Sequence, residues 1–249
     1  MIILRKKRRS REMRIDIIDV AGNITQEKVK GKTVIIIDVL RATSVMTTAL
    51  ANGVKAIYPY KDIESVLEKS KLDKNPLLCG ERKGLKIEGF DCGNSPLEYP
   101  RELVEGRNMY MTTSNGTRAI EKSAVGAEKI YISAFLNVGR VAKQIVEDNR
   151  DVVIVCSGTD DNFSLDDALC AGEIIKRATK EKAIELSDMA IGLKFIAENS
   201  KDIPTTLKGT KHYEYLKSIG FTGDMEHCFT MDKYDILPFY NDGKIIVKE

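Results

Sequence analysis

The chain has 249 residues, of which 43% are hydrophobic and 31% charged, as in an ordinary globular protein with a substantial core. The formal net charge is +2, but residues 1–12 contribute +5 of it, so the remaining body carries −3 and offers no obvious basic surface for nucleic acid. No apolar run approaches the roughly 20 residues that span a bilayer, and no secretory signal is recognisable, so we expect a cytoplasmic protein without a membrane partner.

We expect residues 1–13 to form a basic, disordered tail, because short runs of like charge repel each other and stay solvated. Residues 14–249 contain no repeat of fixed period and no low-complexity linker, which predicts one α/β domain that could consist of two lobes. The five cysteines are scattered and odd in number, so we expect neither a disulfide framework nor a zinc knuckle. The oligomeric state is left open, and a homo-oligomer is compatible with the sequence.

Strands and helices alternate along the chain, which predicts an α/β fold around a mostly parallel or mixed sheet. Strands are expected at 14–20, 34–37, 54–58, 76–79, 109–111, 129–132 and 152–155. Helices are expected at 44–52, 63–67, shortly after 117, and at 137–147, 164–178, 187–199 and 204–219, with paired strands at 235–239 and 244–247. Residues 22–31 should be a polar connection. Residues 80–100, with four glycines and two prolines, should form an ordered but irregular loop of the kind that often carries function.

The stretch TVIIIDVLRATS, residues 33–44, reads as a buried strand that ends at Asp38 and leads into a polar turn and a helix. A carboxylate at this end of a strand can hold a hard cation or act as a nucleophile, although Asp38 could also be only salt-bridged to Arg41 or accept hydrogen bonds from amides of the turn. Arg41 offers a planar fork suited to phosphate or sulfonate oxygens. Thr43 and Ser44 could present hydroxyl and amide groups to an anion, and Thr43 could equally be a plain N-cap.

Two later segments repeat the order of strand, polar turn and helix. The first, MYMTTSNGT at 109–117, supplies four candidate anion contacts, which a simple capped turn would explain equally well: Ser114, Asn115, Gly116 and Thr117. The second is VVIVCSGTDDNFSLDD at 152–167, and its candidate substrate contacts are Ser157 and Gly158. We expect the three polar turns to converge on one phosphate- and metal-binding site, because the carboxyl ends of parallel strands share an edge of the sheet.

Carboxylates are the expected metal ligands in this site. Asp167 is one candidate, although Ser164 and Asp167 also match a helix capping box, and Glu81, directly after a strand, is another. The chain lacks a P-loop, the second aspartate of the DxD phosphatases and the CxxxxxR motif of cysteine phosphatases. Two histidines are too few for a histidine-rich centre, so the residues favour a carboxylate-held metal, and Mg²⁺ rather than Zn²⁺.

Four ordered motifs resemble those of the 2-phosphosulfolactate phosphatase (ComB) family. They are DVLRATS at 38–44, GER at 80–82 together with GFDCGNSP at 89–96, TSNGT at 113–117 and SLDDALCAG at 164–172. The resemblance runs from about residue 14 to the C-terminus. It implies a three-layer α/β/α sandwich and a Mg²⁺-dependent phosphatase that converts (R)-2-phospho-3-sulfolactate to 3-sulfolactate and phosphate, a step of coenzyme M biosynthesis. The residues that fall on the family's motif positions are Asp38, Arg41, Glu81, Arg82, Asn94, Ser95, Asn115 and Asp167.

The role of each residue is our own inference rather than part of the resemblance, and we expect Asp38, Glu81 and Asp167 to hold one Mg²⁺ ion. Arg41 and Arg82 would bind the phosphoryl and sulfonate groups, and either water or Asp38 would be the nucleophile. Asn94 and Ser95 would add further substrate contacts. A phosphatase or phosphotransferase for another small anionic phosphomonoester remains an alternative, as does a non-catalytic anion-binding regulator. Few aromatic residues, 6% with no Trp, argue against recognition of a nucleobase.

Overall fold

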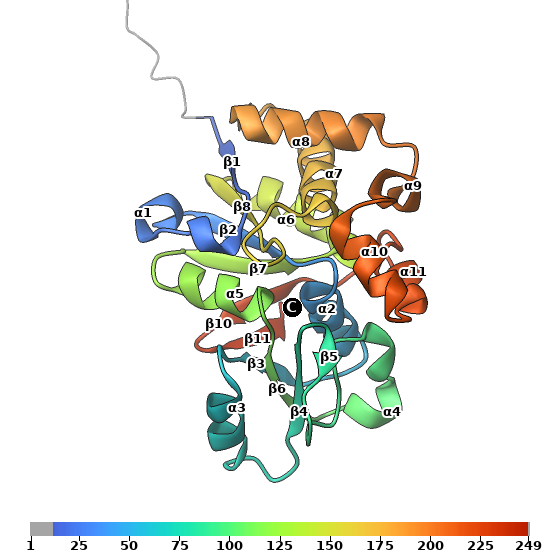
Figure 1. Ribbon diagram of the computed structural model, residues 1–249. Coiled ribbons are helices and arrows are strands. Elements are labelled where there is room, and N and C mark those ends of the chain that lie inside the picture. The colour runs from blue at the N-terminus through green and yellow to red at the C-terminus, as the bar shows by residue number, and fades with distance from the viewer. Residues whose placement is uncertain (1–11, 249) are drawn as a thin grey trace, which may run out of the picture.

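The computed structural model describes residues 12–248, so the predicted tail lies outside the described residues except for Glu12 and Met13. Eleven strands join in one sheet (Figure 1). The strands are β1 (Arg14–Ile18), β2 (Thr33–Ile37), β3 (Ala56–Pro59), β4 (Leu77–Arg82), β5 (Leu85–Lys86), β6 (Asn108–Thr112), β7 (Lys129–Ser133), β8 (Val152–Cys156), β9 (Glu185–Leu186), β10 (Pro238–Asn241) and β11 (Lys244–Val247).

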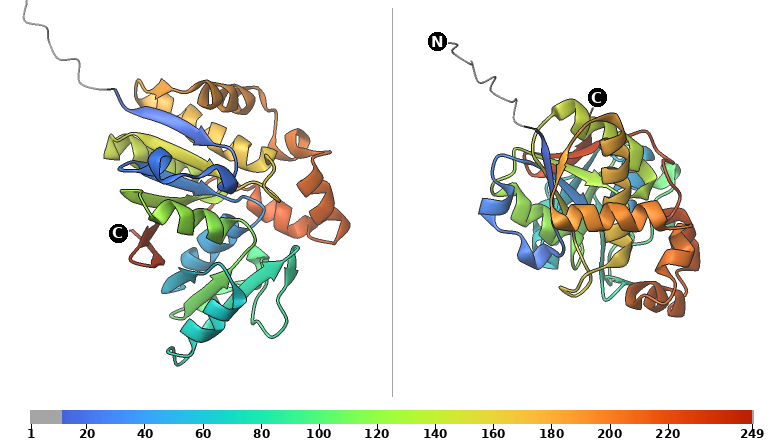
Figure 2. Two further views of the ribbon diagram at one scale, coloured as in Figure 1. Left: turned by 60° about the vertical axis from the view of Figure 1, so that its left-hand side comes forward. Right: turned by 90° about the horizontal axis from the view of Figure 1, so that it is seen from above.

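The sheet is mixed because a C-terminal hairpin separates two parallel blocks. Its strand order is β5-β4-β6-β3-β11-β10-β7-β2-β8-β1-β9. Strands β9, β1, β8, β2 and β7 run parallel to one another, as do β3, β6 and β4. Strand β10 is antiparallel to β7, and β11 is antiparallel to both β10 and β3, so the two blocks run in opposite senses. Figure 2 shows how strongly the sheet twists from one block to the other.

Helices cover both faces of the larger block, which confirms the predicted three-layer sandwich. They are α1 (Gln26–Val29), α2 (Ala42–Ala51), α3 (Ile63–Ser70), α4 (Arg101–Val104), α5 (Gly116–Ala124), α6 (Val138–Asp148), α7 (Leu165–Glu181), α8 (Asp188–Asn199), α9 (Ile203–Leu207), α10 (Lys211–Ser218) and α11 (Thr222–Cys228), with 3-10 turns at Ala21–Asn23, Pro96–Glu98 and Phe135–Asn137.

The four consecutive apolar residues of β2 divide between two cores. Ile35 and Ile37 pack with residues of α6, α7 and α8 on one face of the sheet. Val34 and Ile36 pack with residues of α2 and α5 on the other face. Since side chains alternate along a strand, an uninterrupted apolar run is what a strand covered on both sides requires. The predicted central strand is therefore confirmed, together with its burial on both faces.

Several features of local structure were predicted wrongly or missed. The loop expected at 80–100 begins as strand, because residues 80–82 extend β4 and β5 pairs with them in a hairpin. The helix expected at 204–219 is two helices, α9 and α10, separated by Gly209 with φ +86°, a conformation that a helix cannot contain. Helix α11 was missed, and the polar connection at 22–31 contains a 3-10 turn and the one-turn helix α1.

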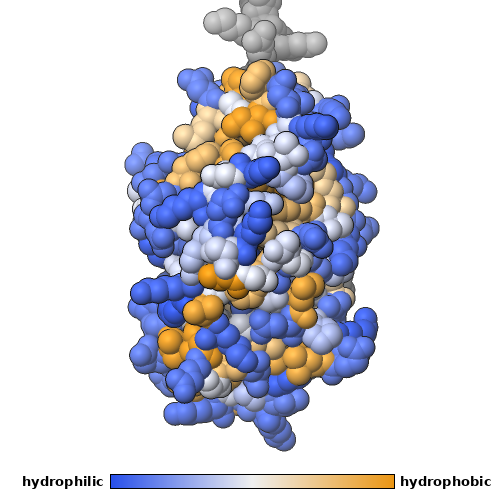
Figure 3. Space-filling model, turned by 45° about the vertical axis from the view of Figure 1, so that its right-hand side comes forward, coloured by the Kyte–Doolittle hydropathy of each residue, from blue (hydrophilic) through white to orange (hydrophobic). Residues whose placement is uncertain are grey.

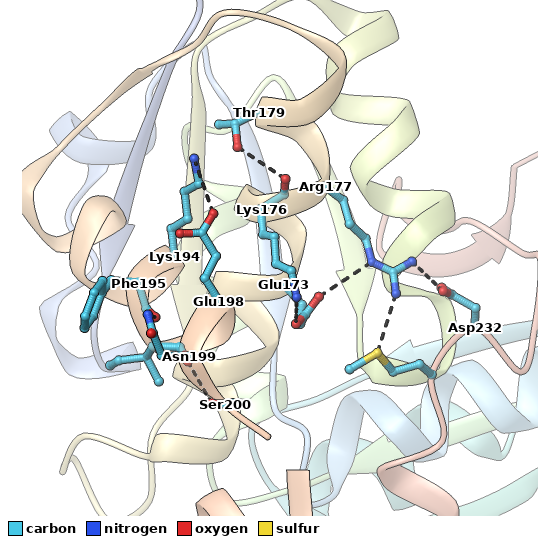
Figure 4. Close-up of polar contacts among 12 residues, drawn as sticks. Glu173, Lys176, Arg177, Thr179, Lys194, Phe195, Glu198, Asn199, Ser200 and Asp232 are labelled. Atoms are coloured by element: carbon cyan, nitrogen blue, oxygen red, sulfur yellow. Dashed lines mark hydrogen bonds and ion pairs between the residues drawn. The ribbon is translucent and has the colours of Figure 1, made fainter. Parts of the chain in front are cut away.

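Helix α7 is packed closely on α8 because Gly172 has no side chain. A Cβ atom at this position would lie 2.2 Å from the Leu193 carbonyl oxygen and 2.9 Å from the Ala197 Cβ. Farther along α7, the half-buried Lys176 and Arg177 lie beside Glu173, and Arg177 also pairs with Asp232 (Figure 4). These contacts fix the position of a helix whose first turn carries Asp166 and Asp167.

The face shown in Figure 3 is mainly hydrophilic, and its apolar residues lie in separate patches. Among residues 12–248, no helix has both the length and the apolar character that crossing a membrane would require.

Candidate active site

The three predicted polar turns meet at one cavity of about 610 Å³. Besides these turns, the hairpin of β4 and β5 and helix α10 form its wall. The lining residues are Asp38, Leu40, Arg41, Glu81, Lys83, Gly84, Asn94, Thr113, Ser114, Asn115, Thr159, Asp160, Lys211, His212, Glu214, Tyr215, Leu216 and Ser218. A second cavity, of about 480 Å³, lies along α7 and is lined by none of the predicted site residues.

Asp38 lies at the carboxyl end of β2 and is held by the helix that follows. Its Oδ1 accepts a hydrogen bond from the Ala42 N–H at 3.1 Å. The Thr43 hydroxyl lies 3.0 Å from the Asp38 nitrogen and 2.9 Å from its carbonyl oxygen. Helix α2 begins at Ala42 with Arg41 as N-cap, so Thr43 is not the N-cap and instead fixes the backbone of Asp38.

The Asp38 carboxyl is in an environment that disfavours its charge. Burial raises its pKa to about 7, hydrogen bonds from the Ala42 and Gly116 N–H groups lower it, and the charges of Asp166 and Glu81 raise it. The side chain is nevertheless at the cavity wall, with the whole residue 7% exposed. A buried carboxyl group next to other carboxyl groups is a position that a bound cation would stabilise.

Asp167 lies beside Asp38 but faces the backbone. Its Oδ1 accepts a hydrogen bond from the Val39 N–H at 2.8 Å, and its Oδ2 accepts one from the Gly158 N–H at 3.0 Å. It therefore joins the ends of β2 and β8 and does not line the cavity. Burial raises the pKa of Asp167 well above its usual value, and the negative charges of Asp166 and Asp38 raise it further. The Ser164 hydroxyl donates to Asp166, so the side-chain contacts of the predicted capping box are absent.

Glu81 lies at the cavity, where it connects the hairpin to the TSNGT turn. One carboxylate oxygen accepts from the Ser114 N–H and the other from the Gly84 N–H, both at 2.8 Å. The residue is 5% exposed. Two backbone donors hold this carboxylate in place while the second lone pair of each oxygen remains for a ligand.

Arg41 is a cavity residue whose guanidinium group is already engaged. Its Nη1 pairs with Asp224 at 2.5 Å, and its Nη2 donates to the Gly84 carbonyl oxygen at 2.7 Å. The guanidinium also lies 3.9 Å from the centre of the Phe221 ring. Asp224 in turn accepts from the Ser95 hydroxyl at 2.7 Å. The predicted phosphate fork is thus a buried structural link, and Ser95 supports it from outside the cavity.

Arg82 is the predicted catalytic residue that does not line the cavity. Its Nη1 donates to the Glu81 carbonyl oxygen at 2.7 Å, and its Nη2 lies 3.1 Å from the Thr112 hydroxyl. Asn94, in contrast, lines the cavity, and its Oδ1 is buried with no hydrogen-bond partner within residues 12–248. A buried oxygen atom without a partner is an acceptor that a bound ligand or cation could satisfy.

The remaining predicted contacts divide between the cavity wall and its supports. Ser114 and Asn115 line the cavity. The Ser44 hydroxyl donates to the Val39 carbonyl oxygen, and Thr117 bonds to Thr113. Gly116 lies against the carboxylate of Asp38, since a Cβ there would be 2.9 Å from Asp38 Oδ2. Ser157 and Gly158 are buried behind Thr159 and Asp160, which line the cavity instead.

Several cavity residues were missed by the sequence analysis. Lys83 is in the β4–β5 turn, and the others lie on helix α10, which no motif marks: Lys211, His212, Glu214, Tyr215 and Ser218. The His212 Nδ1 lies 3.0 Å from the Thr159 hydroxyl, which connects α10 to the turn after β8. Only the arrangement of distant segments could identify these residues. Asp224 was missed for the same reason.

The donor set at the buried side of the cavity fits a hard cation. Asp38, Glu81 and Asn94 offer carboxylate and amide oxygens, which Mg²⁺ prefers. Within the described part of the chain, no group of three or more His, Cys, Asp or Glu residues is placed to hold a metal. The predicted trio with Asp167 is therefore not assembled, because Asp167 is turned to the backbone. Two carboxylates are still adequate, since Mg²⁺ commonly keeps water and substrate oxygens as its other ligands.

Comparison with known proteins agrees with these motifs. The family model described as 2-phosphosulpholactate phosphatase matches residues 18–243. A protein of Clostridium perfringens is 45% identical over 237 residues, covering 94% of this chain and 96% of its own length. Proteins of Clostridium acetobutylicum and Clostridium tetani are each 46% identical, covering 94% of this chain and 100% of their own lengths. All three are named probable 2-phosphosulfolactate phosphatase. The chain therefore belongs to the 2-phosphosulpholactate phosphatase family.

Proposed function

We propose that this protein is a Mg²⁺-dependent phosphatase that hydrolyses (R)-2-phospho-3-sulfolactate to 3-sulfolactate and inorganic phosphate. One observation carries the proposal: three motif residues that are at most 7% exposed, Asp38, Glu81 and Asn94, line one cavity. Family membership and the names of the relatives support the substrate. A role in coenzyme M biosynthesis, a cytoplasmic location and the absence of a nucleic-acid partner stay predictions.

In the reaction, an oxygen nucleophile attacks phosphorus and the ester P–O bond breaks. Water finally supplies the oxygen added to phosphate, and a proton converts the leaving oxygen into the hydroxyl group of sulfolactate. Asp38 and Glu81, with the Asn94 Oδ1 beside them, would hold Mg²⁺. When bound, this ion would supply positive charge that stabilises the phosphoryl oxygens during transfer.

The backbone of this chain orients both carboxylates before substrate arrives. The Ala42 N–H holds Asp38, and the Ser114 and Gly84 N–H groups hold Glu81. A site built in this way needs little rearrangement during the reaction, which is the main source of catalytic power in phosphoryl transfer. Asp38 is either the nucleophile or the residue that positions the attacking water.

These two roles of Asp38 can be separated by chemical trapping. Borohydride reduction during turnover, followed by peptide mass mapping, would convert a phosphorylated Asp38 into homoserine. Homoserine at position 38 would identify Asp38 as the nucleophile. Its absence under conditions of rapid turnover would leave water as the nucleophile.

The activity itself is tested with a panel of phosphomonoesters and a readout of free phosphate. We expect hydrolysis of 2-phosphosulfolactate to require Mg²⁺ and to fall by about a hundredfold or more in Asp38→Asn, the loss expected when a group that acts on the transition state is removed. Asp161→Asn is the control, because Asp161 pairs with Arg118 and does not line the cavity. Preference for a nucleotide, binding of 2-phosphosulfolactate without hydrolysis, or full activity of Asp38→Asn would each contradict the proposal.

A further inference from the structure

We propose that Lys83 and Lys211 form the subsite for the sulfonate group of the substrate and so determine specificity. The inference rests on the proposed function, because it concerns the same cavity. It replaces the expectation that Arg41 and Arg82 bind the sulfonate. Neither arginine has a free guanidinium group facing the cavity, since Arg41 is paired with Asp224 and Arg82 does not line the wall.

The cavity has two chemically different ends. Asp38, Glu81 and Asn94 are buried and supply oxygen atoms at the inner end. Lys83 and Lys211 line the same cavity but are exposed, so these residues lie at its mouth. A phosphoryl group held near the carboxylates and a cation would leave the other end of a short substrate at the mouth.

The two lysines are available to a ligand. Across residues 12–248, neither the Lys83 nor the Lys211 ammonium group forms an ion pair or a hydrogen bond. Of the two acids at the mouth, Glu214 accepts a hydrogen bond from the Gly209 N–H at 3.0 Å. The other, Asp160, has a positive φ of +52° and is exposed. An anionic group that enters this end therefore meets two ammonium groups that have no ion-pair partner among residues 12–248, beside two acids that likewise form no ion pair.

Lys83 is positioned by its surroundings, although it is exposed. It has a φ of +53° in the two-residue turn of the β4–β5 hairpin, a left-handed backbone conformation that residues other than Gly, Asn and Asp rarely adopt. The Tyr215 hydroxyl donates to the Lys83 carbonyl oxygen at 2.9 Å. The next residue, Gly84, is bound on both sides, by Arg41 and by Glu81. The turn is thus fixed between the inner end of the cavity and helix α10.

A sulfonate suits this end because its three oxygens can accept hydrogen bonds from separate donors. Lysine is a point charge with three rotatable donors, so two lysines from different segments can share one sulfonate without the rigid geometry that a guanidinium requires. The matched compound without this group is 2-phospholactate, which keeps the phosphate and the carboxylate. Comparison of the two esters isolates the contribution of the sulfonate.

The experiment measures kcat and KM of the full chain with Mg²⁺ for both esters, in wild type, Lys83→Met, Lys211→Met and the double variant. Methionine keeps the length of the stem and removes the charge. We expect the KM for 2-phosphosulfolactate to rise by about three- to tenfold in the double variant, as for the loss of exposed charge pairs. The KM for 2-phospholactate and the kcat for both esters should be unchanged. Lys83→Arg and Lys211→Arg should retain most of the affinity.

Lys86→Met and Lys217→Met are the controls, because these lysines lie on the same hairpin and the same helix but do not line the cavity. An equal rise in KM for both esters, or an unchanged KM for the sulfonated ester, would overturn the subsite.

Calorimetric binding of 3-sulfolactate and lactate is measured in parallel, since it does not depend on turnover. If wild type hydrolyses neither ester but the double variant binds 3-sulfolactate more weakly, the proposed function fails and the subsite stands. If the lysine variants also bind 3-sulfolactate normally, both fail.

Discussion

Arg41 and Asp224 form a buried ion pair across 183 residues of sequence, with 2.5 Å between Nη1 and Oδ2. Their side chains are 2% and 4% exposed. Because Asp224 also accepts from the Ser95 hydroxyl, one carboxylate on α11 connects the turn after β2 with the GNSP motif. Two motifs far apart in the chain are thus held together by a residue outside both.

Asp224→Asn should destabilise the protein, because Arg41 would remain buried without its counter-charge. We expect a loss of about 3–5 kcal/mol in the free energy of unfolding, measured by urea denaturation, together with reduced phosphate release. Asp232→Asn is the matched control, since it breaks the half-exposed pair with Arg177 and should cost less than about 1 kcal/mol. Similar effects of the two substitutions would show that burial of the Arg41 pair is unimportant.

Gly116→Ala should reduce the activity of the enzyme while the fold is kept. The added Cβ would lie 2.7 Å from the Ala42 Cβ and 2.9 Å from Asp38 Oδ2, so the carboxylate must move. Circular dichroism should be unchanged and kcat should fall by about tenfold or more. Gly192→Ala in α8 is the control, because no atom lies within 4 Å of the new Cβ and alanine favours a helix by about 1 kcal/mol. Normal kcat in Gly116→Ala would mean that the position of Asp38 is not critical.

Mg²⁺ should stabilise the protein through the two cavity carboxylates. At a free Mg²⁺ concentration one hundred times its Kd, binding adds about 2.7 kcal/mol to the free energy of unfolding, which thermal denaturation detects as a higher Tm. The increase in Tm should disappear in Asp38→Asn and in Glu81→Gln. In wild type, a chelator should abolish the increase, and removal of the chelator should restore it. The exposed variant Asp161→Asn should respond like wild type. An undiminished shift in Glu81→Gln would exclude Glu81 from the metal site.

Asp148 should make stability depend on pH at acid values. Burial raises the pKa of its carboxyl, but hydrogen bonds from Lys129, Tyr131 and Gln144 outweigh burial, so the pKa lies below its usual value of 3.8. The Asp148 carboxyl therefore binds a proton more readily in the unfolded chain than in the folded one. The stabilisation that the ionised Asp148 gives the fold is complete above the unfolded pKa, and it is lost as pH falls through the lower folded pKa. Urea denaturation should show the stability difference between wild type and Asp148→Asn shrinking as pH drops below about 4. A difference independent of pH would contradict the assignment.

Much of the fold could be predicted from local patterns. The unbroken apolar run of β2 indicated a strand covered on both faces, and the polar residues after β2, β6 and β8 indicated the cavity. The turn tripeptide at 241–243 predicted the C-terminal hairpin, and β11 was placed correctly at Lys244–Val247. Each of these features depends on neighbours within about ten residues, so the sequence displays them directly. The break at Gly209 depends on its positive φ of +86°, which the sequence does not display, because a lone glycine can also be accommodated within a helix.

The roles of individual site residues could not be predicted in the same way. Asp38, Glu81 and Arg41 were expected at the site and do line the cavity. Asp167 was expected to bind the metal and Arg41 the phosphoryl or sulfonate group, but Asp167 is bonded to Val39 and Gly158 and Arg41 to Asp224. A motif reports which residue types are present, but it does not report which of their atoms already have partners.

The amino-acid order by itself determined the layered α/β architecture, the polar turns that form the cavity and the family, because periodicity and motif spacing are properties of short segments. Only the tertiary structure decided which charges are left free, since Arg41 and Asp167 bind Asp224 and the Val39 N–H, which lie 183 and 128 residues away. For the same reason it was the packing of α10 and the β4–β5 turn across the cavity, rather than any motif, that brought Lys83 and Lys211 to the mouth.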